Sequence, residues 1–399
     1  MFVEILLAIL AGVASGIFTG LTPGIHINLV SLLLLSSSPA LSKFLPLEAL
    51  ACFVIAMGIT HTFLDVLPSI FLGAPDESEA LGVLPGHRFL LKGEGMDAVK
   101  LSVIGAFFGL LLSILLAPLL FFAIKYGYSH VQNYIPHILI AASMYMILRD
   151  RTKWWAVLVF FMSGMLGMIV FSMETLNDPL FPMLSGLFGV STLLISLKDK
   201  NNIPEQKPSK LKIGKMKLIK ALLSGNLSAF ITSTMPGLSS SIAATMSLQV
   251  TRKLHDDGFL ILLGAIGTAG FSLSLVTLAA IGKARNGAII VVQKLVGEVV
   301  PGHFLFFLCA CLIAGSISLM LSIYLGRGFA KFITKVNYQV VCWSVIGFIV
   351  LLVILITGWI GLLVLLTSTA LGIIPGIVKC TRTQAMGCLI LPVLAFFVI

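Results

Sequence analysis

The side chains best suited to chemistry in this sequence surround two Pro-Gly pairs, Pro23-Gly24 and Pro236-Gly237, each inside an apolar stretch. Proline removes a backbone donor and glycine relaxes the chain, so each pair should interrupt a helix. A helix that restarts there directs free N–H groups and its positive dipole end at one point, which favours a carboxylate or phosphate group. We therefore predict a substrate-binding site near the midplane. It consists of the two pairs and the polar residues Thr22, His26, Asn28, Thr234, Ser239 and Ser240.

A second polar cluster, Thr60, His61 and Asp65, lies in the next apolar stretch. His61 and Asp65 are four residues apart and therefore share one face of a helix. An ionisable pair inside a membrane is costly and by default marks a proton or ion path, although a structural pair would show the same spacing. We predict an ion-coupling site at Thr60, His61 and Asp65, with Thr268 as the uncharged counterpart in the second half. The proton would be carried by His26, His61 or Asp65; sodium is the alternative ion, and no other cofactor is expected.

The sequence lacks three common enzyme signatures. It contains no G-x-x-x-x-G-K-[ST] phosphate loop, no H-E-x-x-H motif, no G-x-S-x-G motif and no segment large enough for a soluble ATPase domain. The six cysteines lack the spacing of a metal site. We therefore expect no catalytic residues, although His61 and Asp65 leave an intramembrane lipid-processing enzyme as an alternative.

The elements that position these residues must lie in a membrane. Of the 399 residues, 58% are hydrophobic and 11% charged, and the mean hydropathy is +1.09, whereas soluble domains carry about 25% charged residues. Long apolar runs and the need to satisfy backbone groups in lipid favour helices over a barrel. We predict an all-α polytopic membrane protein with roughly 10–14 membrane segments.

The net charge of +10 lies mostly in short loops between apolar runs. The positive-inside rule explains this placement, so we expect anionic membrane lipids as neighbours and no nucleic acid as a partner. The charge also divides the chain into a first membrane repeat, residues 1–197, a basic connector, 198–215, and a second membrane repeat, 216–399.

The two halves resemble each other at positions 209 residues apart. The matches are Gly58 with Gly267, Gly73 with Gly282, and Leu112-Ser-Ile-Leu115 with Leu321-Ser-Ile-Tyr324, while Pro23 and Pro236 are 213 apart. The basic loops place equivalent segments on opposite sides of the membrane. This is the pattern of inverted repeats in secondary transporters.

The apolar stretch that follows each Pro-Gly pair is short. At 1.5 Å per residue, neither 25–35 nor 238–250 can cross a hydrocarbon core of about 30 Å. We predict that each is the second arm of a re-entrant hairpin, or a half-helix that meets its partner at the midplane.

Several of these residues also resemble a known family. The run Gly16-x3-Gly20-x2-Pro23-Gly24, the serine-rich segment at Pro236-Gly237 and the run Gly264-x2-Gly267-Thr268 are similar to signatures of the TctA family. This family comprises the large membrane subunits of tripartite tricarboxylate transporters, and the chain looks closest to its shorter archaeal-type branch. The resemblance implies an ion-coupled transporter of carboxylate anions in a prokaryotic cell membrane. It also implies a small membrane subunit and a solute-binding protein as partners.

We therefore predict a secondary active transporter of an organic anion, coupled to an ion gradient, rather than an enzyme. A flippase for polyprenyl phosphate remains an alternative, because half-helix ends suit a phosphate as well as a carboxylate. The ligand would then be an anionic lipid instead of a small organic anion. A homodimer is compatible with either function.

Overall fold

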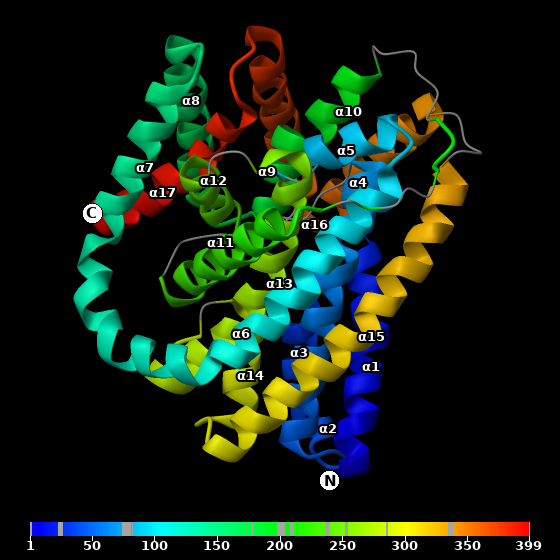
Figure 1. The fold of residues 1–399 in the computed structure, drawn as a ribbon, viewed down its shortest axis with the longest axis vertical. Helices are drawn as coiled ribbons and strands as arrows, with labels where there is room; N and C mark the ends of the chain where they lie inside the picture. The colour runs from blue at the N-terminus through cyan, green and yellow to red at the C-terminus, as the bar shows by residue number, and fades with distance from the viewer. Residues whose placement is uncertain are drawn as a thin grey trace.

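The computed structural model describes residues 2–22, 27–73, 81, 83–176, 179–197, 204–207, 211, 213–235, 240–251, 254–284, 286–333 and 338–398. These residues form helices and no strand (Figure 1). Within this part of the chain, seven helices are long and apolar enough to cross a membrane, and five further apolar helices are shorter. The predicted all-α polytopic membrane fold is therefore confirmed.

One set of helices packs into a core bundle that draws on both predicted halves. The first half contributes α1 (Phe2–Leu21), α2 (Ile27–Leu41), α3 (Leu47–Leu64), α4 (Val66–Leu72), α5 (Val83–Leu91) and α6 (Gly95–Val131). The second half contributes α11 (Lys215–Thr234), α12 (Ser240–Val250), α13 (His255–Ile281), α14 (Gly287–Val296) and α15 (Pro301–Ile333). At the centre lie α3–α4 and α13, since 89% of the most apolar window of each is buried, against 28–39% for the other long spans.

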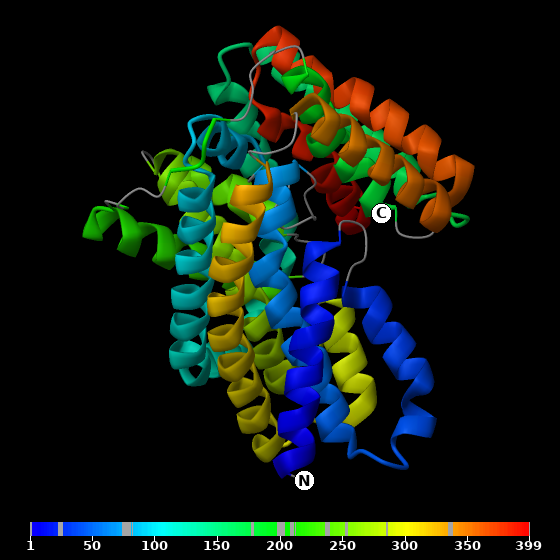
Figure 2. The same cartoon turned by 90° about the vertical axis from the view of Figure 1, so that its right-hand side faces the viewer.

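The remaining helices form an outer bundle, again from both halves. It contains α7 (Ile135–Arg149), α8 (Lys153–Phe171), α9 (Leu180–Leu184), a π-helical segment (Ser185–Val190), α10 (Ser191–Ser196), α16 (Tyr338–Val378), a 3-10 turn (Arg382–Met386) and α17 (Gly387–Val398). Within it, α17 packs on α8, and α16 packs on α8, α9 and α10. Gly358, with a φ of 66°, interrupts α16, and Figure 2 shows the resulting arms in orange and red-orange.

Glycines set the spacing between α1 and α3. A Cβ on Gly12 would lie 2.4 Å from the carbonyl oxygen of Phe53, and one on Gly16 would lie 2.5 Å from the Cβ of Thr60. On Gly20 it would lie 2.9 Å from the Cβ of Leu64. Glycines four residues apart on one face let two helix backbones approach closely, as in other membrane helix pairs. Gly16 and Gly20 of the family-like signature therefore serve helix packing.

Contacts between the two halves occur in pairs, and the members of each pair are related by the 209-residue offset. A Cβ on Gly58 would meet the Phe271 ring at 2.3 Å, and one on Gly267 has Thr62 as its nearest neighbour, at 3.9 Å. Adding 209 to the numbers of Gly58 and Thr62 gives those of Gly267 and Phe271. The two contacts are therefore each other's counterparts.

Hydrogen bonds between the halves repeat the same relation. The hydroxyls of Ser113 and Ser272 are 2.6 Å apart, and the Ser322 hydroxyl donates to the carbonyl oxygen of Phe63 at 3.0 Å. Adding 209 to the number of Ser113 gives Ser322, and subtracting 209 from that of Ser272 gives Phe63, so these two contacts are counterparts as well. Likewise, α4 ends at Gly73 with a φ of 68°, and α13 ends at Gly282 with a φ of 66°. The matched positions of the sequence thus occupy corresponding places in the fold.

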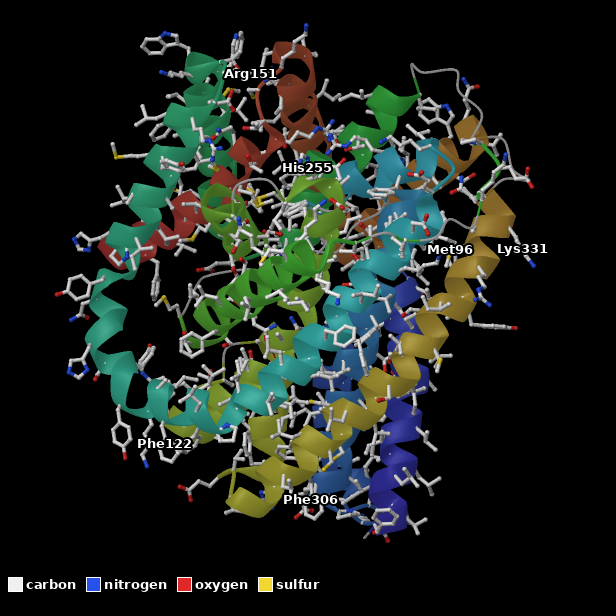
Figure 3. The ribbon with its side chains drawn as sticks, viewed as in Figure 1. Met96, Phe122, Arg151, His255, Phe306 and Lys331 are labelled. Atoms are coloured by element: carbon white, nitrogen blue, oxygen red, sulfur yellow. The ribbon has the colours of Figure 1, made fainter. Side chains whose placement is uncertain are left out.

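Corresponding helices also run in opposite directions. In Figure 3, α6 runs downward from Met96 to Phe122, whereas α15 runs upward from Phe306 to Lys331. The crossed contacts of Gly58 and Gly267 show that α3 and α13 are antiparallel as well. This polarity supports the inverted arrangement, which stays a prediction, as do the boundaries at 197 and 216.

Candidate functional site

The structure places a helix end on each side of both predicted breaks. α1 ends at Leu21 and α2 begins at Ile27, while α11 ends at Thr234 and α12 begins at Ser240. Helix α2 has 15 residues and α12 has 11, which corresponds to about 22 and 16 Å. Both are shorter than the hydrocarbon core, as predicted. The site residues Pro23, Gly24, His26, Pro236, Gly237 and Ser239 lie outside the described residues.

The ionisable pair at the end of α3 lies beside the first break: His61 is in the last turn of α3, and Asp65 lies between α3 and α4. Because Gly12, Gly16 and Gly20 contact successively later residues of α3, the two helices are parallel, and Thr22 lies level with Asp65. The Nδ1 atom of His61 is 3.2 Å from the Thr19 hydroxyl, one turn before the break. His61 and Asp65 are 4% and 3% exposed, so both are inside the protein. Two clusters that the sequence predicted separately are therefore neighbours.

The second break has hydroxyl groups at the corresponding level. Helices α11 and α13 are also parallel, since Gly225 lies against Leu262 and Thr232 lies closest to Gly270. Thr234 therefore lies within one helical turn of Ser274, which is 209 residues after Asp65. The Ser274 hydroxyl donates to the carbonyl oxygen of Gly270 at 2.7 Å. The second half thus presents a neutral side chain where the first presents a carboxylate.

Two of the predicted coupling residues have partners in helix packing. The Thr268 hydroxyl donates to the carbonyl oxygen of Ala106 on α6 at 2.7 Å. The hydroxyl of Thr60 accepts from Ser318 on α15 at 2.9 Å. These bonds hold α3 and α13 against the long helices of the opposite half. Among the described coupling candidates, His61 and Asp65 are the ionisable residues.

Of the predicted substrate-binding residues, Thr234 bonds to its own helix and Asn28 reaches another. The Thr234 hydroxyl donates to the carbonyl oxygen of Phe230 at 2.8 Å. Asn28, in the first turn of α2, lies against Gly287 at the start of α14. Sequence reasoning missed α14 as part of this region. The signal that could have found it is the pair Asn286-Gly287, a helix cap followed by a residue without a side chain.

A buried carboxylate outside the membrane spans, Asp150, ties the outer bundle together. It accepts hydrogen bonds from the backbone N–H groups of Thr152 and Thr381, at 3.0 Å each, and from Gln384 at 3.2 Å. Burial by itself would raise the pKa of Asp150, but these bonds and those from the threonine hydroxyls outweigh it and lower the pKa to about 2. The residue therefore has a structural role between α7 and α16.

The described residues contain no group of three or more His, Cys, Asp or Glu side chains placed to hold a metal ion. The arrangement that they do contain is a broken helix with a buried histidine and aspartate at its side. This arrangement suits the binding of an anion together with a proton or a small cation.

Comparison with protein families matches residues 6–387 to the tripartite tricarboxylate transporter TctA family. The chain belongs to the TctA family. A TctA-family protein with these spans is an integral membrane protein of a prokaryotic cell membrane, and the family points to a transporter component rather than an enzyme. The resemblance found in the sequence is therefore confirmed.

The chain is also similar to an uncharacterized protein of the archaeon Methanocaldococcus jannaschii. The two are 29% identical over 403 residues, and the match covers 98% of each. This relative of equal length is consistent with the archaeal-type branch of the TctA family. No solved structure matches the chain.

Proposed function

We propose that this TctA-family protein is a secondary active transporter of an organic anion of the carboxylate class, coupled to an ion gradient. The observation that carries the proposal is the position of the buried pair His61 and Asp65 beside the first helix break. The family supports the substrate class, since its description is that of tricarboxylate transporters.

The anion is held by backbone groups at the two breaks. Helices α2 and α12 start there, and the first N–H groups of a helix have no intrahelical acceptor. Each helix end carries about half a positive charge, which a carboxylate offsets without a lysine. Thr22, His26 and Asn28 in the first half, and Thr234, Ser239 and Ser240 in the second, would add hydrogen bonds.

Coupling follows from the nearness of Asp65 to the bound anion. Two negative charges in a protein interior repel each other strongly. A proton or sodium ion on the His61–Asp65 pair removes that repulsion, so the cation and the anion bind more tightly together than separately. This coupling is reciprocal, and each ligand strengthens the binding of the other by the same factor.

Alternating access is supplied by the two repeats. We propose that a two-fold axis in the membrane plane, between α3 and α13, relates them. The exchanged contacts of Gly58 with Phe271 and of Gly267 with Thr62 support this axis, as do the opposite directions of α6 and α15. Inverted repeats can exchange conformations, which opens one site to each side in turn. As in other TctA-family systems, we expect a small membrane subunit and a solute-binding protein to assist.

The test is ligand-induced stabilisation of the purified protein. Citrate, dicarboxylates and a polyprenyl phosphate would be compared at several pH values, with and without sodium. A ligand that binds the folded state raises its apparent melting temperature. We expect stabilisation by a carboxylate that increases with acid or with sodium, and that loses this dependence in Asp65→Asn. Stabilisation by the lipid phosphate alone would instead establish the flippase.

A further inference from the structure

The start of α14 lies against the start of α2. A Cβ on Gly287 would be 2.6 Å from both Cγ and Oδ1 of Asn28, so only glycine fits there without movement. From this point α14 packs along α2 and α3, and Figure 2 shows it in yellow between the blue helices. The N-termini of two helices, one from each half, therefore meet beside the first break.

The first turn of α14 has backbone N–H groups that can donate to a ligand. The side chain of Asn286 caps the helix by accepting from the N–H of Ile289 at 2.8 Å. The N–H groups of Gly287 and Ala288, in the first turn, have no intrahelical acceptor. Ala288 is completely buried. Two positive helix ends that meet oppose each other, and a negative group between them removes that cost.

Ser31 is an independent indication of a ligand. Its side chain is completely buried, and its hydroxyl has no hydrogen-bond partner in the described part of the chain. Other buried serines, such as Ser143 and Ser191, donate to a carbonyl four residues earlier, but Ser31 does not. Three residues after Asn28, it shares that residue's face of α2, and helical side chains lean toward the N-terminus. Its hydroxyl is thus directed at the place where the two helix ends meet.

We propose that the N-termini of α2 and α14, together with Asn28 and Ser31, form a subsite for one carboxylate group of the transported anion. This inference rests on the proposed function and names the residues, from both halves, that bind one group of the anion. The carboxylate accepts from the N–H groups of Gly287 and Ala288 and from the Ser31 hydroxyl. The two breaks are 213 residues apart, and the residue 213 positions after Ser31 is Ala244, which has no hydroxyl. The subsite is therefore confined to the first break.

The first test is Ser31→Ala in the purified full-length chain, with citrate as the probe in a thermal-shift titration. The substitution removes an oxygen that has no partner among the described residues, so the melting temperature without citrate should not fall. Loss of a hydrogen bond to a charged group should weaken citrate binding on the order of 10- to 100-fold. Ser368→Ala is the matched control. Ser368, on α16 in the outer bundle, is equally buried and equally unpartnered, and its variant should bind citrate as the wild type does.

A second variant, Asn28→Asp, places a fixed negative charge of nearly the same shape between the two helix ends. We expect an unchanged or higher melting temperature without citrate and complete loss of stabilisation by citrate. If Ser31→Ala and Asn28→Asp both bind citrate like the wild type, the subsite is wrong while the proposed function stands. If the wild type is stabilised neither by citrate nor by any dicarboxylate, the proposed function fails and the subsite with it.

Discussion

The contact between α1 and α3 makes a strong prediction for Gly16→Ala. The new Cβ would lie 2.5 Å from the Cβ of Thr60 and 2.7 Å from the carbonyl oxygen of Met57, whereas carbon atoms in contact are about 3.5–4.0 Å apart. A Cβ and a backbone oxygen cannot rotate away, so α1 must move from α3 by about 1 Å. Overpacking of this kind costs about 1–3 kcal/mol, of which the better helix propensity of alanine returns at most about 1 kcal/mol.

The measurement is reversible unfolding of the purified variant in detergent, with Gly347→Ala as the matched control. Gly347 is also inside a helix, but a Cβ added there has no neighbour within 4 Å. Gly347→Ala then changes only the helix propensity at this position, and this control should be up to about 1 kcal/mol more stable than the wild type. We expect Gly16→Ala to be less stable by about 1–2 kcal/mol. Equal stabilisation of both variants would refute the close packing of α1 on α3.

Three further predictions concern charged residues. In proteoliposomes, Asp65→Asn should abolish the dependence of carboxylate uptake on pH or sodium, and uptake with the wild-type ion dependence would exclude Asp65 from coupling. The pKa of Asp150 is lowered to about 2, so its contribution to stability is present above about pH 4 and disappears as the pH falls toward 2. Asp150→Asn should therefore cost about 2 kcal/mol at pH 7 and little at pH 2, whereas an equal loss at both pH values would contradict the role of its charge. The ion pair of Arg88 and Asp256, at 2.8 Å, is well exposed, so Arg88→Ala should change the unfolding free energy by less than about 1 kcal/mol; a larger loss would show that the pair is part of a network.

The sequence by itself determined the fold class of this protein, the places where its helices are interrupted and several corresponding positions of its two halves. The apolar composition required membrane helices, because polar backbone groups in lipid must bond within their own segment. The Pro-Gly pairs predicted the interruptions that the structure shows between α1 and α2 and between α11 and α12. The repeated glycines at 73 and 282 predicted corresponding positions, and both end a helix with a positive φ. These signals depend on composition, on short motifs and on a repeat within the sequence, and none of them requires knowledge of how the helices pack.

Contacts between distant residues were decided only by the tertiary structure. No local pattern sets the register of α1 on α3, which brings Thr22 level with Asp65 and gives Gly16 and Gly20 a packing role. The approach of Gly287 to Asn28 joins segments more than 250 residues apart. The sequence predicted Thr60 and Thr268 as coupling residues, and only the structure shows the hydrogen bonds of their hydroxyls to α15 and α6. Such contacts arise when whole helix faces pack, and a single face is compatible with many partners until the bundle selects one.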